Sequence, residues 1–131
     1  MVARILSLVA ALALGGCGGA DYPPNGRQAL KGFAVVGGEI WAFQLCGSPL
    51  LISVDIQGTE PGIDKLNRAL PFDCPNCPLS FAYAELDAVV TDDCPCGHVG
   101  KYSHELTIKE VLAASATPPP SCPHVEPHYP Q

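Results

Sequence analysis

Short apolar runs in the middle of the chain, most of them alternating with polar positions, predict β-strands. The third run alternates most regularly, with Leu50, Ile52, Val54 and Ile56 on one face and Ser53 and Asp55 on the other. Gly37 and Gly38 break the first run from the second, and the Cys46-Gly47-Ser48-Pro49 segment after the second supplies turn chemistry. The predicted strands cover residues 30–36, 39–45, 50–56, 80–90 and 105–112.

The fourth predicted strand has small residues on its inner face, and small inner residues let a barrel close tightly. The predicted inward residues of this strand are Ala82, Ala84, Leu86, Ala88 and Val90, and the outward ones are Tyr83, Glu85 and Asp87. The last strand carries Leu106 and Ile108 on one face. We expect both strands to contribute one face to a single core.

The period changes between the third and fourth strands and predicts a short helix over residues 61–70. Ile63, Leu66 and Leu70 fall at helical spacing, Thr59 can cap the helix, and Pro61 suits its first turn. The order of three strands, a helix and two strands is that of the OB-fold, a small five-stranded Greek-key barrel. The predicted fold is therefore a mainly β, OB-like barrel with one short helix; a split sheet packed on one helix is the alternative.

The first sixteen residues have the features of an export signal. Arg4 precedes an apolar run over residues 5–14, which is too short to cross a bilayer as a helix. Leu14-Gly15-Gly16-Cys17 resembles the lipobox of bacterial lipoproteins, in which the cysteine thiol receives a diacylglyceryl group before cleavage. The resemblance implies lipidation, including palmitate-like acyl chains, at Cys17 and a protein held on a membrane by that lipid. Gly18, where an inner-membrane retention signal has aspartate, favours the outer membrane, facing the periplasm or the cell surface.

Composition divides the remainder into a tether, one domain and a tail. We expect residues 17–28 to be a flexible tether, residues 29–115 the β domain and residues 116–131 a proline-rich, polyproline-like tail. Thirteen acidic side chains against seven basic ones give no electrostatic footprint for nucleic acid or anionic lipid. The membrane contact must therefore come from the lipid.

Six cysteines follow Cys17, and outside the cytosol an even number favours disulfides. They are Cys46, Cys74, Cys77, Cys94, Cys96 and Cys122. In an OB-like barrel the turns at Cys46 and at Cys94 to Cys96 lie at the same end, so these cysteines can pair. A ring closed by Cys94 and Cys96 alone would be strained, and we expect each to pair elsewhere. Cys122 is expected to fasten the tail to the domain.

A metal site is the alternative reading of the cysteines. Cys74, Cys77, Cys94, Cys96 and His98 include two closely spaced thiol pairs that could hold Zn²⁺ or Cu⁺, with His104 nearby. The predicted strand 80–90 separates the two pairs by roughly 33 Å, which argues against one shared site. Thiol redox chemistry at Cys74 and Cys77 is a third reading, disfavoured because this pair does not open a helix after a strand.

Other side chains are weaker candidates for chemistry. His124 and His128, beside Glu126, could capture a metal loosely. Glu85 and Asp87 on an outer strand face are expected to be solvated rather than an acid–base pair. Trp41, Phe43 and Phe81 could form a stacking face for a ligand, although core packing is the default. No Ser-His-Asp arrangement has a recognisable nucleophile turn, and catalysis is not expected.

Three strings of the chain are similar to a group of bacterial envelope lipoproteins. They run from Gly38 to Asp55, from Phe81 to Leu86 and from Leu106 to Leu112. The group is related in fold to the NlpE-type OB domain, found in an envelope lipoprotein tied to copper homeostasis and surface sensing. The resemblance implies an OB-like barrel on a lipid tether. Gly38 stands where the group often has histidine, and the cysteine segments are additional, so copper binding is not carried over.

The function expected from the sequence is a lipid-anchored binding or structural module of the cell envelope, without a cofactor and with an envelope protein as partner. The alternative is an envelope lipoprotein that binds or senses copper or zinc through its cysteine loops. The oligomeric state does not follow from the sequence.

Overall fold

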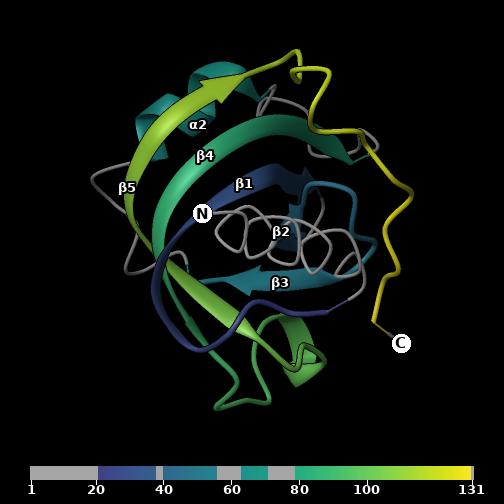
Figure 1. The fold of residues 1–131 in the computed structure, drawn as a ribbon. Helices are drawn as coiled ribbons and strands as arrows, with labels where there is room; N and C mark the ends of the chain where they lie inside the picture. The colour runs from purple at the N-terminus through teal and green to yellow at the C-terminus, as the bar shows by residue number, and fades with distance from the viewer. Residues whose placement is uncertain (1–20, 38–39, 56–62, 71–78, 131) are drawn as a thin grey trace, which may run out of the picture.

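The computed structural model describes residues 21–37, 40–55, 63–70 and 79–130. Five strands and one α-helix are the main elements (Figure 1). Their bounds are β1 Gly26–Gly37, β2 Ile40–Leu45, β3 Leu51–Val54, α2 Ile63–Ala69, β4 Ser80–Thr91 and β5 Glu105–Ser115, with a 3₁₀ turn, η3, at His98–Gly100. The residues predicted to be an export signal, together with Cys17, Cys74 and Cys77, lie outside the described residues.

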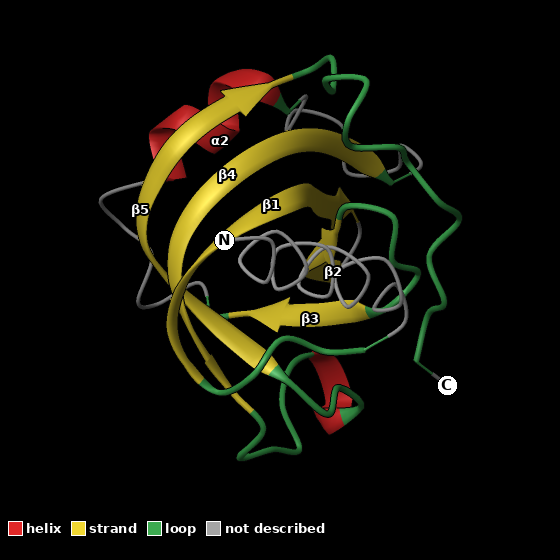
Figure 2. Ribbon diagram, viewed as in Figure 1, coloured by secondary structure: helices red, strands yellow, loops and turns green. Residues whose placement is uncertain are grey.

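The five strands close into a barrel in the order β1-β2-β3-β5-β4 (Figure 2). β1 pairs with both β2 and β4, and all strand pairs are antiparallel except β3 with β5. The parallel pair joins Ser53 to Glu105 and Val54 to Leu106, and this pairing closes the ring. The predicted mainly β, OB-like barrel with one short helix is confirmed.

The barrel interior holds one apolar core to which every strand contributes. Ala82, Ala84 and Ala88 on β4 are each almost fully buried there, as the alternation along this strand predicts. Leu66 from α2 and Leu70, directly after it, join the same core, and α2 packs against β4 and β5. Lys65 on the helix donates to the backbone oxygen of Val111 at 3.0 Å. Together these contacts fix the helix against the barrel.

Two irregularities in β5 change the alternation that the sequence suggests. The register against β4 shifts between Glu85 and Leu86 and again between Asp87 and Ala88. Leu106 and Ile108 are buried as predicted, but the next buried residue is Val111, three positions on. The two irregularities interrupt the alternation after Ile108, and Leu112 is 50% exposed. β5 also continues past its predicted end at Leu112.

Both faces of β3 are buried, which the simple alternation did not predict. Leu51 to Val54 are all buried, including Ser53 on the face opposite the aliphatic residues. The reason is that a loop and the C-terminal tail cover the outside of the barrel here.

The first strand begins earlier than the sequence predicts. β1 starts at Gly26, inside the segment expected to be a flexible tether.

Candidate functional site

The C-terminal tail packs against the barrel, so the expectation of an unpacked polyproline-like segment was wrong. We call residues 116–130 the strap; in Figure 1 it runs down one side of the barrel to the C-terminus. The disulfide Cys46–Cys122 ties it to the turn after β2, as expected for Cys122. Cys122 is 2% exposed and packs with Phe33 and Tyr83, and this group is the strap cluster.

Backbone hydrogen bonds and one buried amide hold the strap further along its length. The His128 amide donates to Pro49 O at 2.8 Å, and the Gly47 amide donates to Pro123 O at 3.4 Å. Gln44 on β2 is 1% exposed, and its Nε2 donates to Val125 O at 2.6 Å and to Ser48 O at 2.8 Å. Because buried donors and acceptors cost free energy when unpaired, these bonds specify the strap's path.

The β4–β5 loop (residues 92–104) covers the neighbouring part of the outer surface. Tyr102 is buried against Val35, Ala42 and Leu51, and this group is the loop cluster. Cys96 and Tyr102 exchange both backbone hydrogen bonds, at 3.1 and 3.0 Å. The loop is therefore a small folded unit that lies on β1, β2 and β3.

Gly97 makes the close approach of this loop possible. Its φ is 75°, and a Cβ placed there would collide with the Tyr102 ring and lie 2.7 Å from Ser53 Oγ. The loop backbone thus rests directly on β3, which is why Ser53 is buried. Only glycine combines this conformation with this contact at no steric cost.

A hollow of about 210 Å³ lies where the loop and the end of the strap meet. Its lining residues are Ile40, Val99, Lys101, Tyr102, Tyr129 and Pro130. Val99 is 70% exposed and has φ 51°, a conformation that β-branched residues rarely adopt. Tyr129 is 37% exposed. The loop therefore presents apolar side chains to solvent at a strained backbone position.

The two tyrosines of the hollow stay neutral at neutral pH. Burial, and in smaller part Tyr129, raises the pKa of Tyr102. Burial, and then the carboxylate of Glu126, raises the pKa of Tyr129. Lys101 is consequently the one charged side chain among the residues lining the hollow.

A larger hollow of about 440 Å³ is lined by residues of α2 and β5. In Figure 1, α2 lies at the opposite end of the barrel from the β4–β5 loop. Lys65, Arg68 and Leu112 line it together with the last residues of β5. Both cations are exposed. This hollow is a solvated groove with scattered charge rather than a built apolar site.

The structure joins Cys94 to Cys96, so the expectation that each pairs elsewhere was wrong. The Cα atoms are 4.7 Å apart, and Cys96 is held in position by its backbone pairing with Tyr102. Cys46, which the barrel topology would have allowed to pair with either of them, is bonded to Cys122 instead. The packed strap brings Cys122 next to Cys46, a proximity that the barrel topology alone does not supply.

The candidate metal ligands are not assembled in the part of the chain that the structure describes. The Cys94 and Cys96 sulfurs are bonded to each other, the His98 backbone lies in η3, and Cys74 and Cys77 lie outside the described residues. Within residues 21–37, 40–55, 63–70 and 79–130, no group of three or more His, Cys, Asp or Glu could hold a metal ion. His124 packs edge-on against Phe33 and Phe81, with ring centroids 4.9 and 4.5 Å apart.

The three aromatic residues considered as a stacking face do not form one surface. Phe43 is 1% exposed inside the barrel, and Trp41 packs against the same core. Phe81 lies outside the barrel, between the loop cluster and the strap cluster. Their shared role is packing, which was the default expectation.

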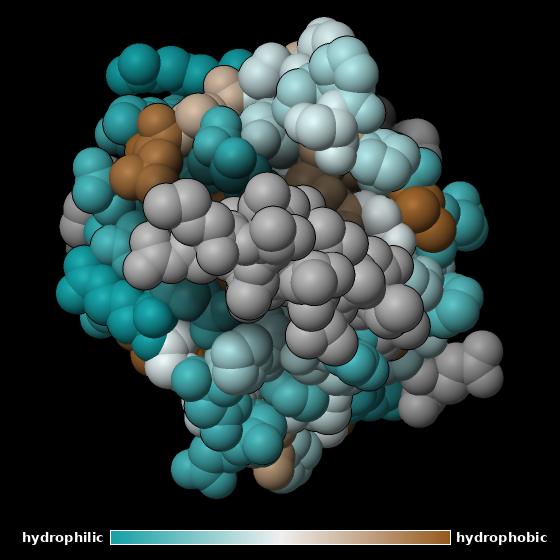
Figure 3. Space-filling view, viewed as in Figure 1, coloured by the Kyte–Doolittle hydropathy of each residue, from teal (hydrophilic) through white to brown (hydrophobic). Residues whose placement is uncertain are grey.

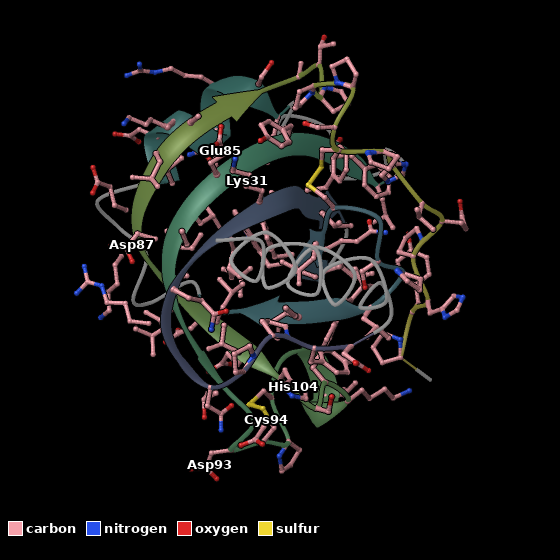
Figure 4. All side chains as sticks on the ribbon, viewed as in Figure 1. Lys31, Glu85, Asp87, Asp93, Cys94 and His104 are labelled. Atoms are coloured by element: carbon pink, nitrogen blue, oxygen red, sulfur yellow. A yellow bond between two sulfur atoms is a disulfide. The ribbon has the colours of Figure 1, made fainter. Side chains whose placement is uncertain are left out.

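Glu85 and Asp87 form cross-strand ion pairs on the outside of the barrel. Lys31 Nζ lies 3.6 Å from Glu85 Oε1, and Figure 4 shows the two side chains next to each other between β1 and β4. Arg27 binds both oxygens of Asp87, at 3.1 and 2.8 Å. This hydrogen-bonded pair lowers the pKa of Asp87. Two separately paired carboxylates are not an acid–base dyad.

The segment before β1 is docked at the base of the β4–β5 loop. Tyr22 stacks on His104 with ring centroids 3.9 Å apart and the planes 7° from parallel. Asn25 Nδ2 donates to Asp92 Oδ1 at 2.9 Å. The loop, the strap and the start of the domain therefore enclose one side of the barrel. On the face that Figure 3 shows, most of the coloured residues are hydrophilic, and the apolar patches are separate.

Sequence reasoning missed the residues of the hollow. Val99 lies in a loop and Tyr129 in a proline-rich tail, so neither belongs to a periodic pattern. One available signal was that Val99 is aliphatic and Tyr129 aromatic, although their segments are otherwise polar or rich in proline and glycine.

In comparisons with known proteins, no family model, no curated protein and no solved structure matches this chain. None of the helices in the described residues is long and apolar enough to cross a bilayer.

Proposed function

We propose that this protein is a lipid-anchored module of the cell envelope that holds a partner protein through the hollow between the β4–β5 loop and the strap. The observation that carries the proposal is the exposed, strained Val99 beside Tyr129. A non-glycine residue in a left-handed conformation costs about 1 to 3 kcal/mol and persists where the surrounding structure imposes it. Here that conformation presents an apolar side chain to solvent.

The size of the hollow favours one protruding side chain over a whole small molecule. Small-molecule sites usually have volumes of about 300 to 1,000 Å³, and this hollow has about 210 Å³. A single aromatic or aliphatic side chain inserted into such a hollow is the usual anchor of a protein interface. Because Tyr102 and Tyr129 are neutral and Lys101 lies at the site, the inserted residue would be apolar, with any charged neighbour acidic.

Attachment to the membrane is the second part of the proposal and depends on Leu14 to Cys17. The lipobox resemblance supports acylation of the Cys17 thiol, and the disulfides suit an oxidising compartment. Metabolic labelling with an alkyne fatty acid should mark the full-length chain and leave the Cys17→Ser variant unmarked. Equal labelling of both proteins would contradict the anchor.

The docking surface is tested by a photo-crosslinking amino acid placed at position 99 of the full-length chain in intact cells. Leu112 gives the matched control, because it is exposed and apolar but lies at the other end of the barrel. We expect one adduct of defined mass from position 99, reduced by Tyr129→Ser, and none from position 112. Equal yields at the two positions, or no adduct at 99, would rule out this surface.

A further inference from the structure

The disulfide between Cys94 and Cys96 encloses a single residue, Pro95, and lies in the β4–β5 loop. Pro95 is exposed and both cysteines are half-buried, so the sulfur pair is at the surface. Figure 4 shows Asp93 and Cys94 on this loop, at the end of the barrel opposite α2. The pair can therefore be reached by a thiol from solvent.

This disulfide contributes little to the stability of the fold. A cross-link stabilises mainly by restricting the unfolded chain, and the effect grows with the number of residues enclosed. The two cysteines are 2 positions apart, whereas Cys46 and Cys122 are 76 apart. By the chain-entropy relation, the short ring therefore contributes much less to stability than the long one.

The loop keeps its shape through bonds that do not involve sulfur. Cys96 and Tyr102 exchange two backbone hydrogen bonds, and the Gly100 amide donates to Gly97 O at 3.1 Å. Upstream, the Cys94 amide donates to Asp92 O at 2.9 Å, and the Asp93 amide donates to Thr91 Oγ1 at 3.0 Å. The two sulfurs would therefore stay close after reduction, and a high effective concentration favours closing the ring again.

The surroundings of the two sulfurs differ. Cys96 packs against the loop cluster, whereas Cys94 belongs to none of the three buried clusters. Cys96 Sγ also lies 3.5 Å from Asp93 O, an acceptor for the S–H group that exists once the ring is open. An incoming thiolate thus meets Cys94 first, and the Cys96 sulfur has a place as the leaving group.

We propose that Cys94–Cys96 is a thiol–disulfide exchange site that accepts two electrons from a dithiol client. A client thiolate attacks Cys94 Sγ, the Cys94–Cys96 bond breaks, and Cys96 leaves as a thiolate that takes up a proton. The second client thiolate then attacks the client sulfur of the mixed disulfide and releases Cys94 as a thiolate. The client leaves as a disulfide, and an external disulfide oxidant restores the ring by the reverse exchange.

The charges beside the pair select the kind of client. Asp92 and Asp93 immediately precede Cys94 and both are exposed, in a chain of formal net charge -6. A thiolate in a cationic molecule is attracted to this loop, while one in an anionic molecule is repelled. The preferred client is a cysteine pair flanked by lysine or arginine.

The first test compares the two described disulfides in one molecule. The full-length chain, in detergent and with Cys74→Ala and Cys77→Ala, is treated with a limiting amount of dithiothreitol, alkylated at intervals and mapped by mass spectrometry. We expect Cys94 and Cys96 to be alkylated at least tenfold faster than Cys46 and Cys122. Equal rates, or faster opening of Cys46–Cys122, would overturn the proposal.

The second test measures selectivity and the direction of attack. In the same background, cysteamine should open the ring several-fold faster than the anionic thiol 2-mercaptoethanesulfonate at equal thiolate concentration, and added salt should remove the difference. With glutathione disulfide as the probe, Cys96→Ala should trap a mixed disulfide at Cys94 faster than Cys94→Ala traps one at Cys96. No charge preference would exclude the cationic client, and the opposite order of trapping would overturn the assigned attack on Cys94.

Discussion

The two disulfides of the described chain restrain two different segments, the strap and the β4–β5 loop. Cys46–Cys122 joins residues 76 positions apart, with Cys122 buried in the strap cluster. Cys94–Cys96 joins residues 2 positions apart at the surface of a loop whose backbone is already hydrogen-bonded. The Cys46–Cys122 bond fixes the position of the strap, whereas the Cys94–Cys96 bond changes the conformation of the β4–β5 loop little.

This difference distinguishes a disulfide that stabilises the fold, Cys46–Cys122, from the disulfide that we propose undergoes thiol exchange, Cys94–Cys96. A bond that encloses most of the domain restricts the unfolded chain strongly, and this bond holds Cys122 beside Phe33 and Tyr83. A bond within a folded loop can open and close without a large conformational change. The strap is held in place by its disulfide in addition to hydrogen bonds, whereas the loop is held mainly by its backbone hydrogen bonds.

The largest expected effect is that of removing the strap disulfide. Cys46→Ala with Cys122→Ala should lower the free energy of unfolding by about 2 to 5 kcal/mol, because the long enclosed segment regains its freedom in the unfolded state. Urea unfolding of the full-length chain in detergent measures this. A loss no larger than that caused by removing Cys94 and Cys96 would remove the basis of the comparison.

Gly97→Ala is expected to have an intermediate effect, because it forces the loop backbone away from β3. Gly47→Ala is the matched control: both glycines have positive φ, at 75° and 72°, but only Gly97 has atoms within contact distance of the added Cβ. We expect Gly47→Ala to cost about 1 kcal/mol and Gly97→Ala about 2 to 4 kcal/mol. Equal losses in urea unfolding would mean that the loop does not rest on Ser53 and Tyr102.

The smallest expected effect is that of Cys94→Ala with Cys96→Ala. The loss of stability should be about 1 to 2 kcal/mol at most, since the enclosed ring is short and the hydrogen bonds of the loop remain. Amide hydrogen exchange at Cys96 and Tyr102 should stay protected in this variant. Loss of that protection would show that the sulfur bond, and not the backbone, holds the loop.

A strand that buries one face is predictable, because burial of one face leaves a period of two in the sequence. β4 shows this over Ala84 to Val90, whereas Tyr83, predicted to point outward, is buried under the strap. The bulges of β5 were not predictable, because a residue looped out of the ladder leaves no compositional mark. Cys94–Cys96 was missed because an argument from ring size leaves out the loop backbone, which places the two Cα atoms 4.7 Å apart.

For the candidate site, the sequence predicted the chemical type of the cysteines but not where the site lies in the fold. The cysteines were identifiable as disulfide-forming residues, but Val99, Tyr129 and the burial of Gln44 depend on a tail that folds back onto the barrel. Proline-rich composition excludes a helix or a central strand, yet it does not exclude packing. Backbone hydrogen bonds, one buried amide and the Cys46–Cys122 disulfide together dock this segment.

The sequence by itself determined the order of strands and helix along the chain and the alanine-lined face of β4, because these follow from local periodicity and composition. Only the tertiary structure decided which cysteines pair, which outer faces are covered and where the hollow lies. Those features depend on contacts between residues such as Cys46 and Cys122, and local patterns carry no record of which distant residues meet.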